Sequence, residues 1–219
     1  MSTAVLIRRP TAAADLATAE GSHWTHRSAC RTAEADRDFY GTSAAAQARA
    51  RATCLSCPVR LECLTERSAV DVEENWWGMV GGLDAEQRRV LEVAELIGER
   101  PDLKRAQELL TPRWRYRLYN LRAAGHAPQR IADILTAEGI AVDAITVRVA
   151  VWWTGGPGRA ISRRASRDRR PLWQRLRDDY ADVICLLRAR GARHVDVAAY
   201  LGVRVTTLTR ATQELEAAA

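Results

Sequence analysis

The 219-residue chain has one phenylalanine, a single lysine at Lys104 and no long apolar run. Its most apolar stretch, residues 141–153, is interrupted by Asp143 and Arg148. It falls short of the roughly 20 residues that a membrane-spanning helix needs. The first apolar residues, 5–7, are followed at once by charged ones, which argues against a secretory signal peptide. The sequence therefore predicts a cytoplasmic protein with no membrane partner.

Positive charge exceeds negative charge, and the formal net charge is +6. A basic chain fits a polyanionic partner such as nucleic acid. The abundance of arginine and alanine is also what a GC-rich bacterial genome encodes, so the choice of arginine over lysine carries little information. The composition permits nucleic-acid binding without establishing it.

Glycine, proline and charge divide the chain into five segments. These are a flexible tail at 1–20, a cysteine-containing domain at 21–100, a helical unit at 101–154, a Gly/Arg-rich linker at 155–170 and a second helical unit at 171–219. Apolar residues recur at helical spacing in the folded segments, and strand candidates are few. In the first domain, Asp84 is the expected N-cap of a helix, and Pro101 follows its end. We therefore predict an all-α protein.

The unit at 101–154 has the pattern of a helix-turn-helix. A helix beginning at Pro112 precedes two more, and Gly139 separates the second from a third at 143–153. Three helices with a tight glycine-centred connection are typical of this motif. Thr146 and Arg148 fall where a recognition helix would contact DNA, and a purely structural role is the alternative.

The unit at 171–219 contains the clearer helix-turn-helix pattern. A long helix at 172–189 is followed by a short helix at 195–201, a turn at Gly202 and a closing helix at 206–215. Polar side chains on the exposed side of the closing helix can reach phosphates and base edges. A protein-binding domain with a solvated face is the alternative. The predicted DNA-binding residues here are Arg204, Thr206, Thr207, Arg210 and Gln213.

The linker carries a run of arginines in which Asp168 is the only acid. Such a run can lie along the DNA backbone and would make affinity depend steeply on salt. A solvated linker is the alternative. The linker residues predicted to bind DNA are Arg163, Arg164, Arg167, Arg169 and Arg170.

Four of the five cysteines lie between residues 30 and 63. Structural disulfides are rare in a reducing compartment, whereas Cys54 and Cys57 are spaced to grip one metal centre. Cys63 is within reach of them, and the fold must bring in Cys30. Four thiolates suit a [4Fe–4S] cluster or a tetrahedral zinc site, and spacing alone does not choose between these. Cys185 stands apart and is expected to be a buried apolar side chain.

Residues 24–91 resemble the WhiB-like regulators of actinobacteria and their phages. The matching elements are Ala29-Cys30, Asp-Phe-Tyr at 38–40, CLSCPVRLEC at 54–63, and GMVGGL at 78–83 before a charged helix. The resemblance implies a [4Fe–4S] cluster held by Cys30, Cys54, Cys57 and Cys63. It also implies docking on the C-terminal domain of the principal sigma factor within RNA polymerase. The expected architecture is then a small helical cluster domain followed by two helix-turn-helix-like units.

The glycine-rich turn departs from the family at one position. The family carries tryptophan where this chain has Val80, and that aromatic side chain contributes to the sigma contact. An aromatic surface can come instead from the two tryptophans just before the turn, for which ordinary packing is the alternative. The predicted sigma-binding residues are Trp76, Trp77, Gly78, Val80, Gly81 and Gly82.

The predicted function is an iron–sulfur transcriptional regulator that binds sigma factor and promoter double-stranded DNA, with a redox- or nitric-oxide-sensitive cluster. It is not predicted to be an enzyme or to have a small-molecule substrate. One alternative is a thiol–disulfide oxidoreductase in the metal-free form, which would need a βαβ context around the CxxC motif. The other alternative is a zinc-stabilised DNA-binding protein.

Overall fold

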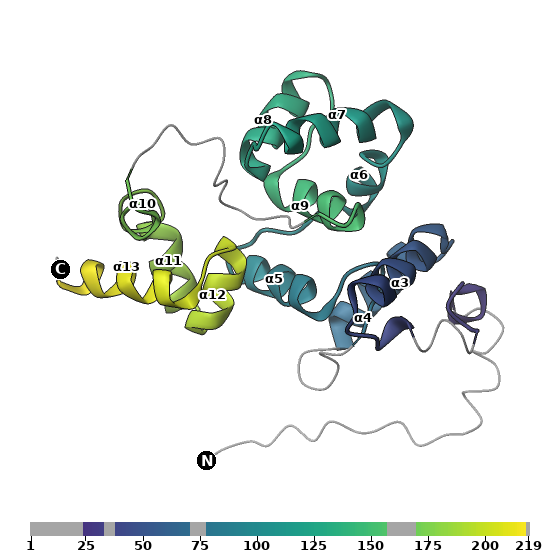
Figure 1. The fold of residues 1–219 in the computed structure, drawn as a ribbon, viewed down its shortest axis with the longest axis horizontal. Coiled ribbons are helices and arrows are strands. Elements are labelled where there is room, and N and C mark those ends of the chain that lie inside the picture. Colours follow the sequence, from purple (N-terminus) through teal and green to yellow (C-terminus); the bar gives the residue numbers. More distant parts are fainter. Residues whose placement is uncertain (1–23, 33–37, 71–77, 157–169, 218–219) are drawn as a thin grey trace, which may run out of the picture.

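The structure, a computed structural model, describes residues 24–32, 38–70, 78–156 and 170–217. Within these residues every regular element is a helix, and the β-type pairing is confined to an isolated bridge between Val80 and Leu83 (Figure 1). The all-α prediction is confirmed. No described helix is long and apolar enough to cross a membrane. The predicted tail at 1–20 lies outside the described residues.

Among the described residues of the N-terminal part, the named elements are a short 3-10 helix and three α-helices. These are η1 (Trp24–Arg27), α3 (Ala44–Ser56), α4 (Arg60–Val70) and α5 (Ala85–Leu96). The Ser43 hydroxyl caps α3 by accepting a 3.1 Å hydrogen bond from the backbone N–H of Ala46. At α5, the Asp84 carboxylate accepts from the Gln87 backbone N–H, and the Gln87 side chain accepts from the Asp84 N–H. This capping box confirms the predicted start of α5.

The middle part contains four helices, and its last helix forms the centre of the packing. The helices are α6 (Leu103–Glu108), α7 (Pro112–Ala123), α8 (Pro128–Ala137) and α9 (Ala144–Trp153). Proline opens α7, as predicted, and also α8, because the backbone N–H that proline lacks has no helical partner in the first turn. Helix α9 packs against α6 and α8, and every residue from 145 to 153 is buried.

The C-terminal part also has four helices, one more than the sequence suggests. They are α10 (Leu172–Asp179), α11 (Ala181–Ala189), α12 (His194–Leu201) and α13 (Val205–Ala217). The prediction of one helix over 172–189 is wrong, because Tyr180 has φ −129° and ψ 11° and bends the chain between α10 and α11. The prediction that Cys185 is buried is also wrong, since Ile184 and Leu187 occupy the buried face of α11.

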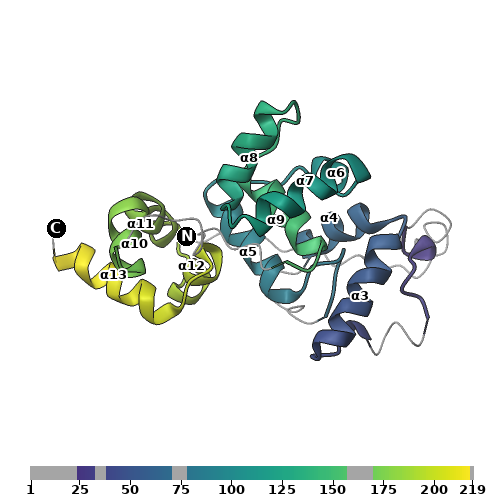
Figure 2. The ribbon, with the colours of Figure 1, turned by 45° about the horizontal axis from the view of Figure 1, so that its top comes forward.

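Helix α5 lies between the rest of the N-terminal part and the two helical units (Figures 1 and 2), and it packs against both α9 and α12. Arg89 of α5 forms a 3.8 Å ion pair with Asp196 of α12. The Tyr200 hydroxyl donates a 2.8 Å hydrogen bond to Glu99, just beyond α5. A single cluster of buried apolar side chains extends from α4 to α13. The three parts of the chain therefore share this main core, beside which Ala50, Cys54 and Met79 form a small separate cluster.

Candidate metal centre and nucleic-acid interface

The four clustered cysteines come from α3, α4 and the segment after η1. Cys54 lies in the last turn of α3, Cys57 is the C-cap residue of that helix, and Cys63 lies near the start of α4. The backbone N–H of Cys57 donates a 3.2 Å hydrogen bond to the carbonyl of Cys54, which turns the chain between them. None of the four forms a disulfide. Cys54 is buried, Cys30 is exposed, and the other two are half-buried.

The electrostatics of Cys54 place the four thiols in one neighbourhood. The pKa of the Cys54 thiol is raised to about 12, chiefly by burial; the Gly82 backbone N–H acts to lower it, and the nearby Cys63, Cys30 and Cys57 thiols add to the rise. No three His, Cys, Asp or Glu side chains among the described residues are close enough to hold one metal ion. The thiols are therefore neighbours without forming a closed single-ion site.

The charge of this neighbourhood fits an iron–sulfur cluster, and the lack of a closed single-ion site among the described residues is compatible with one. In a four-iron cluster each thiolate binds a different iron, so the ligands are held farther apart than around one ion. Arg60 is only 5% exposed, and its Nε has no hydrogen-bond partner among the described residues. Burial lowers the pKa of Arg60, while the thiolates of Cys54 and Cys57 would raise it. A buried cation beside these thiols suits an anionic cluster.

The glycine-rich turn, residues 78–83, folds back tightly beside the cysteines. Val80 and Leu83 exchange two backbone hydrogen bonds of 2.9 Å. Gly81 and Gly82 form the tip, with φ of +55° and +83°. Positive φ at both central residues is the geometry of a type I′ turn, which glycine adopts without strain. A Cβ on Gly81 would also lie 2.6 Å from a side-chain carbon of α4, so the site accepts only glycine.

Trp153, the last residue of α9, covers the tip of the glycine-rich turn. Its indole Nε1 donates a 2.8 Å hydrogen bond to the carbonyl of Gly81, which lies 72 positions earlier in the chain. A Cβ on Gly82 would lie 2.9 Å from the Trp153 ring. The guanidinium of Arg60 lies over the same ring, 4.2 Å from its centroid. The middle unit and the cysteine region therefore meet at this tryptophan.

The predicted sigma-binding residues differ in their accessibility. Gly81 and Gly82 are buried beneath Trp153, whereas Gly78 and Val80 are half-buried. The part of the turn that remains accessible is therefore the side of Gly78 and Val80. Two further predicted residues, Trp76 and Trp77, lie outside the described residues.

The prediction that α9 contacts DNA through Thr146 and Arg148 is wrong. Thr146 is 0% exposed, and its hydroxyl accepts a 2.9 Å hydrogen bond from the Asp102 backbone N–H. Arg148 is 4% exposed, and its guanidinium lies 5.1 Å from the Trp152 ring centroid and 5.3 Å from that of Tyr200. Burial lowers the pKa of Arg148 to about 10. A recognition helix must present one face to a groove, and α9 has no such face.

Helix α13 presents the predicted polar residues on its outer side. The turn before it is set by Gly202, whose φ of +67° ends α12 in the left-handed conformation as expected. Leu208 and Ala211 are fully buried against the core. The guanidinium of Arg210 lies 4.2 Å from the ring centroid of Trp173, which holds it against α10. The exposed residues include Arg204, Thr206, Arg210 and Gln213, while Thr207 is half-buried.

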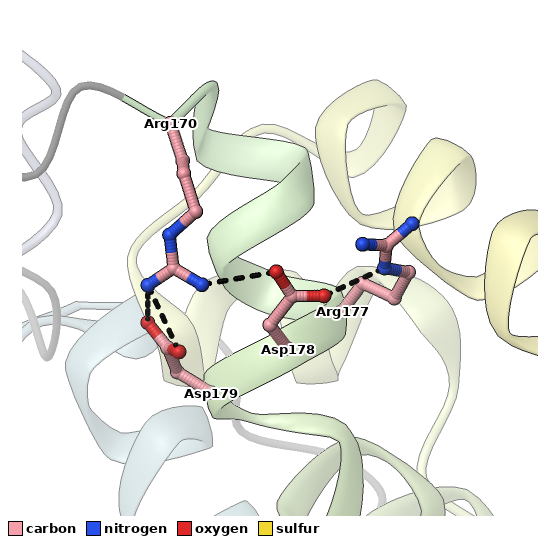
Figure 3. Close-up of polar contacts among 4 residues, drawn as sticks. All are labelled: Arg170, Arg177, Asp178 and Asp179. Atoms are coloured by element: carbon pink, nitrogen blue, oxygen red, sulfur yellow. Dashed lines mark hydrogen bonds and ion pairs between the residues drawn. The ribbon is translucent and has the colours of Figure 1, made fainter.

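Arg170 is held by two carboxylates at the end of α10 (Figure 3). Its Nη1 donates to Asp178 and its Nη2 to Asp179, each at 2.9 Å, and Arg177 donates to Asp178 at 2.7 Å. Each such surface pair contributes only about 0–1 kcal/mol. The charge of Arg170 is nevertheless balanced within its own unit. The other linker arginines predicted to bind DNA, Arg163, Arg164, Arg167 and Arg169, lie outside the described residues.

Two residues of the site, Arg60 and Trp153, have no role assigned from the sequence. A signal exists for Arg60, because a cation lies between two candidate ligands in the 54–63 segment. Trp153 gives no such signal. Its hydrogen-bond partner is distant in the chain, and the sequence pattern at the end of an apolar helix predicts only a buried core residue.

No curated protein and no solved structure matches the chain. Residues 24–91 match the family described as Transcription factor WhiB. The match begins at η1 and ends within α5, so it includes the four clustered cysteines and the glycine-rich turn. This part of the chain is therefore similar to the WhiB family, and the match supports a WhiB-like transcription factor.

Proposed function

We propose that the protein is an iron–sulfur transcriptional regulator that docks on the principal sigma factor and binds promoter DNA. The proposed ligands of a [4Fe–4S] cluster are Cys30, Cys54, Cys57 and Cys63. One observation carries the proposal: the Cys54 thiol is influenced by the other three thiols beside the glycine-rich turn of a WhiB domain. The proposed activity is regulatory, without a small-molecule substrate.

The packing around Cys54 supports a structural role for the cluster. The buried side chains there form a separate small apolar group of Ala50, Cys54 and Met79, with Phe39 packed against it. So small a core contributes little stability alone, and metal ligation supplies folding free energy to such regions. Loss of iron to an oxidant or to nitric oxide would therefore loosen this region, which is the proposed basis of sensing.

The protein's own groups favour the ligating form of the cysteines. A thiol must lose its proton before it binds metal, and burial opposes this at Cys54. The Gly82 backbone N–H and the positive charge of Arg60 both favour the thiolate. When bound, the cluster would supply a redox-sensitive centre in which each of the four irons takes one cysteine thiolate. The chain's contribution is to hold the thiolates in place and limit their contact with water.

The proposed sigma contact is centred on Val80 and Gly78, the accessible part of the glycine-rich turn. The neighbouring Trp76 and Trp77 would supply the aromatic surface that Val80 does not. Gly81 and Gly82 are proposed to act indirectly, by fixing the turn conformation under Trp153.

The proposed DNA contact uses α12 and α13 as a helix-turn-helix, with α13 in the major groove. The exposure of Arg204, Thr206, Arg210 and Gln213 supports this arrangement. The linker arginines would add contacts with the phosphate backbone. Arg170 would take part only if it left its carboxylate partners.

The two alternatives fit the structure less well. A thioredoxin-like reductase needs strands around its CxxC motif, and the described residues contain no strand. A single zinc ion needs three or four ligands within one coordination sphere. No three candidate side chains among the described residues are that close.

Binding of the sigma factor C-terminal domain by anaerobically purified protein tests the proposal. Cys57→Ala is expected to lose the visible absorbance of the cluster and sigma binding together. Cys185→Ala, which changes an exposed cysteine on α11, is the matched control and should retain both. Undiminished sigma binding by Cys57→Ala without the absorbance would show that the cluster and the sigma contact are not coupled.

A further inference from the structure

A cavity of about 540 Å³ lies between α3 and the middle unit, and Arg60 but none of the cysteines lines it. Its wall comes from α3, the start of α4, the connection from α6 to α7 and the end of α9. The volume falls within the range of about 300–1,000 Å³ that is usual for small-molecule sites. Neither the WhiB match nor the proposed function assigns a role to it.

Three guanidinium groups line the cavity, from Arg51, Arg60 and Arg115, and none of the lining residues is acidic. Arg51 has a distant partner, since its nitrogen lies 3.9 Å from the Asp84 carboxylate. Arg115 is exposed on α7 and forms no ion pair with any described residue. Three cations around one space with so little compensating charge produce a positive potential that favours an anion.

Arg60 gives an independent indication of a ligand. It is 5% exposed, yet its Nε has no hydrogen-bond partner among the described residues. Its Nη1 makes one long hydrogen bond of 3.4 Å, to the carbonyl of Leu55. Buried polar groups in folded proteins are normally satisfied. A buried guanidinium with spare donors in a cavity wall is therefore suited to an oxygen-rich anion.

The remaining wall is largely apolar. Leu110, Leu55 and Trp153 line it, together with Thr111 and Thr154, whose hydroxyls donate to the backbone carbonyls of Glu108 and Val151. Thr111 is also the N-cap residue of α7, and its side chain makes no capping hydrogen bond. The positive end of the α7 dipole therefore adds to the charge of the arginines.

We propose that this cavity binds the phosphate group of a nucleotide, either free or within a DNA strand. Guanidinium groups bind phosphate oxygens through paired hydrogen bonds, and they do so better than a lysine would. The apolar wall would contact the non-phosphate part of the ligand. The phosphate can come from a free nucleotide or from the DNA backbone, and the two sources are separated by experiment.

The test is titration of the anaerobically purified full chain with AMP, with adenosine as the phosphate-free comparison. AMP is expected to bind and adenosine is not. Arg115→Gln should weaken AMP binding by about 10-fold or more, as loss of a charge-assisted hydrogen bond does. Arg113→Gln is the matched control, because Arg113 is exposed on the same helix and does not line the cavity. Arg51→Gln, on α3, provides a second variant from the opposite wall.

A random-sequence DNA duplex distinguishes the two sources of phosphate. If AMP does not bind but Arg115→Gln, unlike Arg113→Gln, weakens duplex binding, the site takes backbone phosphate and the proposal stands. Equal binding of AMP and adenosine would overturn it. So would identical behaviour of the Arg115 and Arg113 variants toward both AMP and duplex.

Discussion

The indole N–H of Trp153 and the carbonyl oxygen of Gly81 form a 2.8 Å hydrogen bond that joins the end of α9 to the tip of the glycine-rich turn. Trp153 is 1% exposed. If this hydrogen bond were broken, water could therefore not replace either partner. The turn beside the cysteines is therefore built partly by a residue outside the WhiB match, which ends at residue 91.

Trp153→Phe is expected to destabilise the protein through this hydrogen bond. The substitution removes the donor and leaves a buried carbonyl unsatisfied, which costs about 1–3 kcal/mol in unfolding free energy. Trp114→Phe is the control, since Trp114 is also buried but makes no indole hydrogen bond with a described residue. Urea unfolding of both variants measures the difference. Equal losses would mean that the Trp153 hydrogen bond contributes nothing.

Gly82→Ala tests the close contact between the glycine-rich turn and Trp153. Gly82 and Gly98 have nearly the same φ, +83° and +81°, but a Cβ on Gly98 meets nothing within 4 Å. Gly98→Ala should therefore cost only the backbone strain, about 1–2 kcal/mol. Gly82→Ala should cost about 1–3 kcal/mol more, because its Cβ would lie 2.9 Å from the Trp153 ring. Thermal or urea unfolding compares the two, and similar losses would contradict the packing described.

The metal-free protein is expected to lose stability as the pH rises above 9. The folded-state pKa of Cys54 is raised from 9.0 to about 12 by burial. The unfolded chain then releases this proton first, and unfolding becomes easier by about 1.4 kcal/mol per pH unit between these values. Tyr200 acts in the same direction at higher pH, because burial raises its pKa too. Cys54→Ala should therefore show a shallower decline in urea unfolding at pH 8 to 11, and parallel curves would refute the assignment.

Arg204→Gln should weaken DNA binding and reduce its salt dependence. Loss of one phosphate contact lowers the slope of log K against log salt by about 0.9. Arg130→Gln makes the same charge change on the surface of α8 and should leave the slope unchanged. Fluorescence anisotropy at several salt concentrations measures both. If only Arg130→Gln reduced the slope, the result would indicate that the middle unit, and not Arg204, contacts DNA.

Much of the helical architecture is predictable, because capping residues act locally. Asp84 caps α5 as expected, and Gly202 ends α12 in the left-handed conformation that glycine favours. The break at Tyr180 was not predictable, because the apolar spacing continues across it and the bend comes from tertiary packing. The same holds for Cys185, which lies beside the buried face of its helix.

The site was predictable only in part for the same reason. The cysteine spacing and the glycine-rich turn are local patterns, so their residues stand out in the sequence. The burial of Arg148 and the contact between Trp153 and Gly81 depend on how α9 packs. Hydrophobic periodicity identifies one buried face, and α9 is buried on every face.

Metal analysis of the anaerobically purified full chain tests the central claim most directly. The account predicts a brown protein with about four iron and four acid-labile sulfide atoms per chain, both lost in Cys57→Ala and retained in Cys185→Ala. A colourless protein that folds and binds sigma factor with one zinc ion, or with no metal, would contradict it.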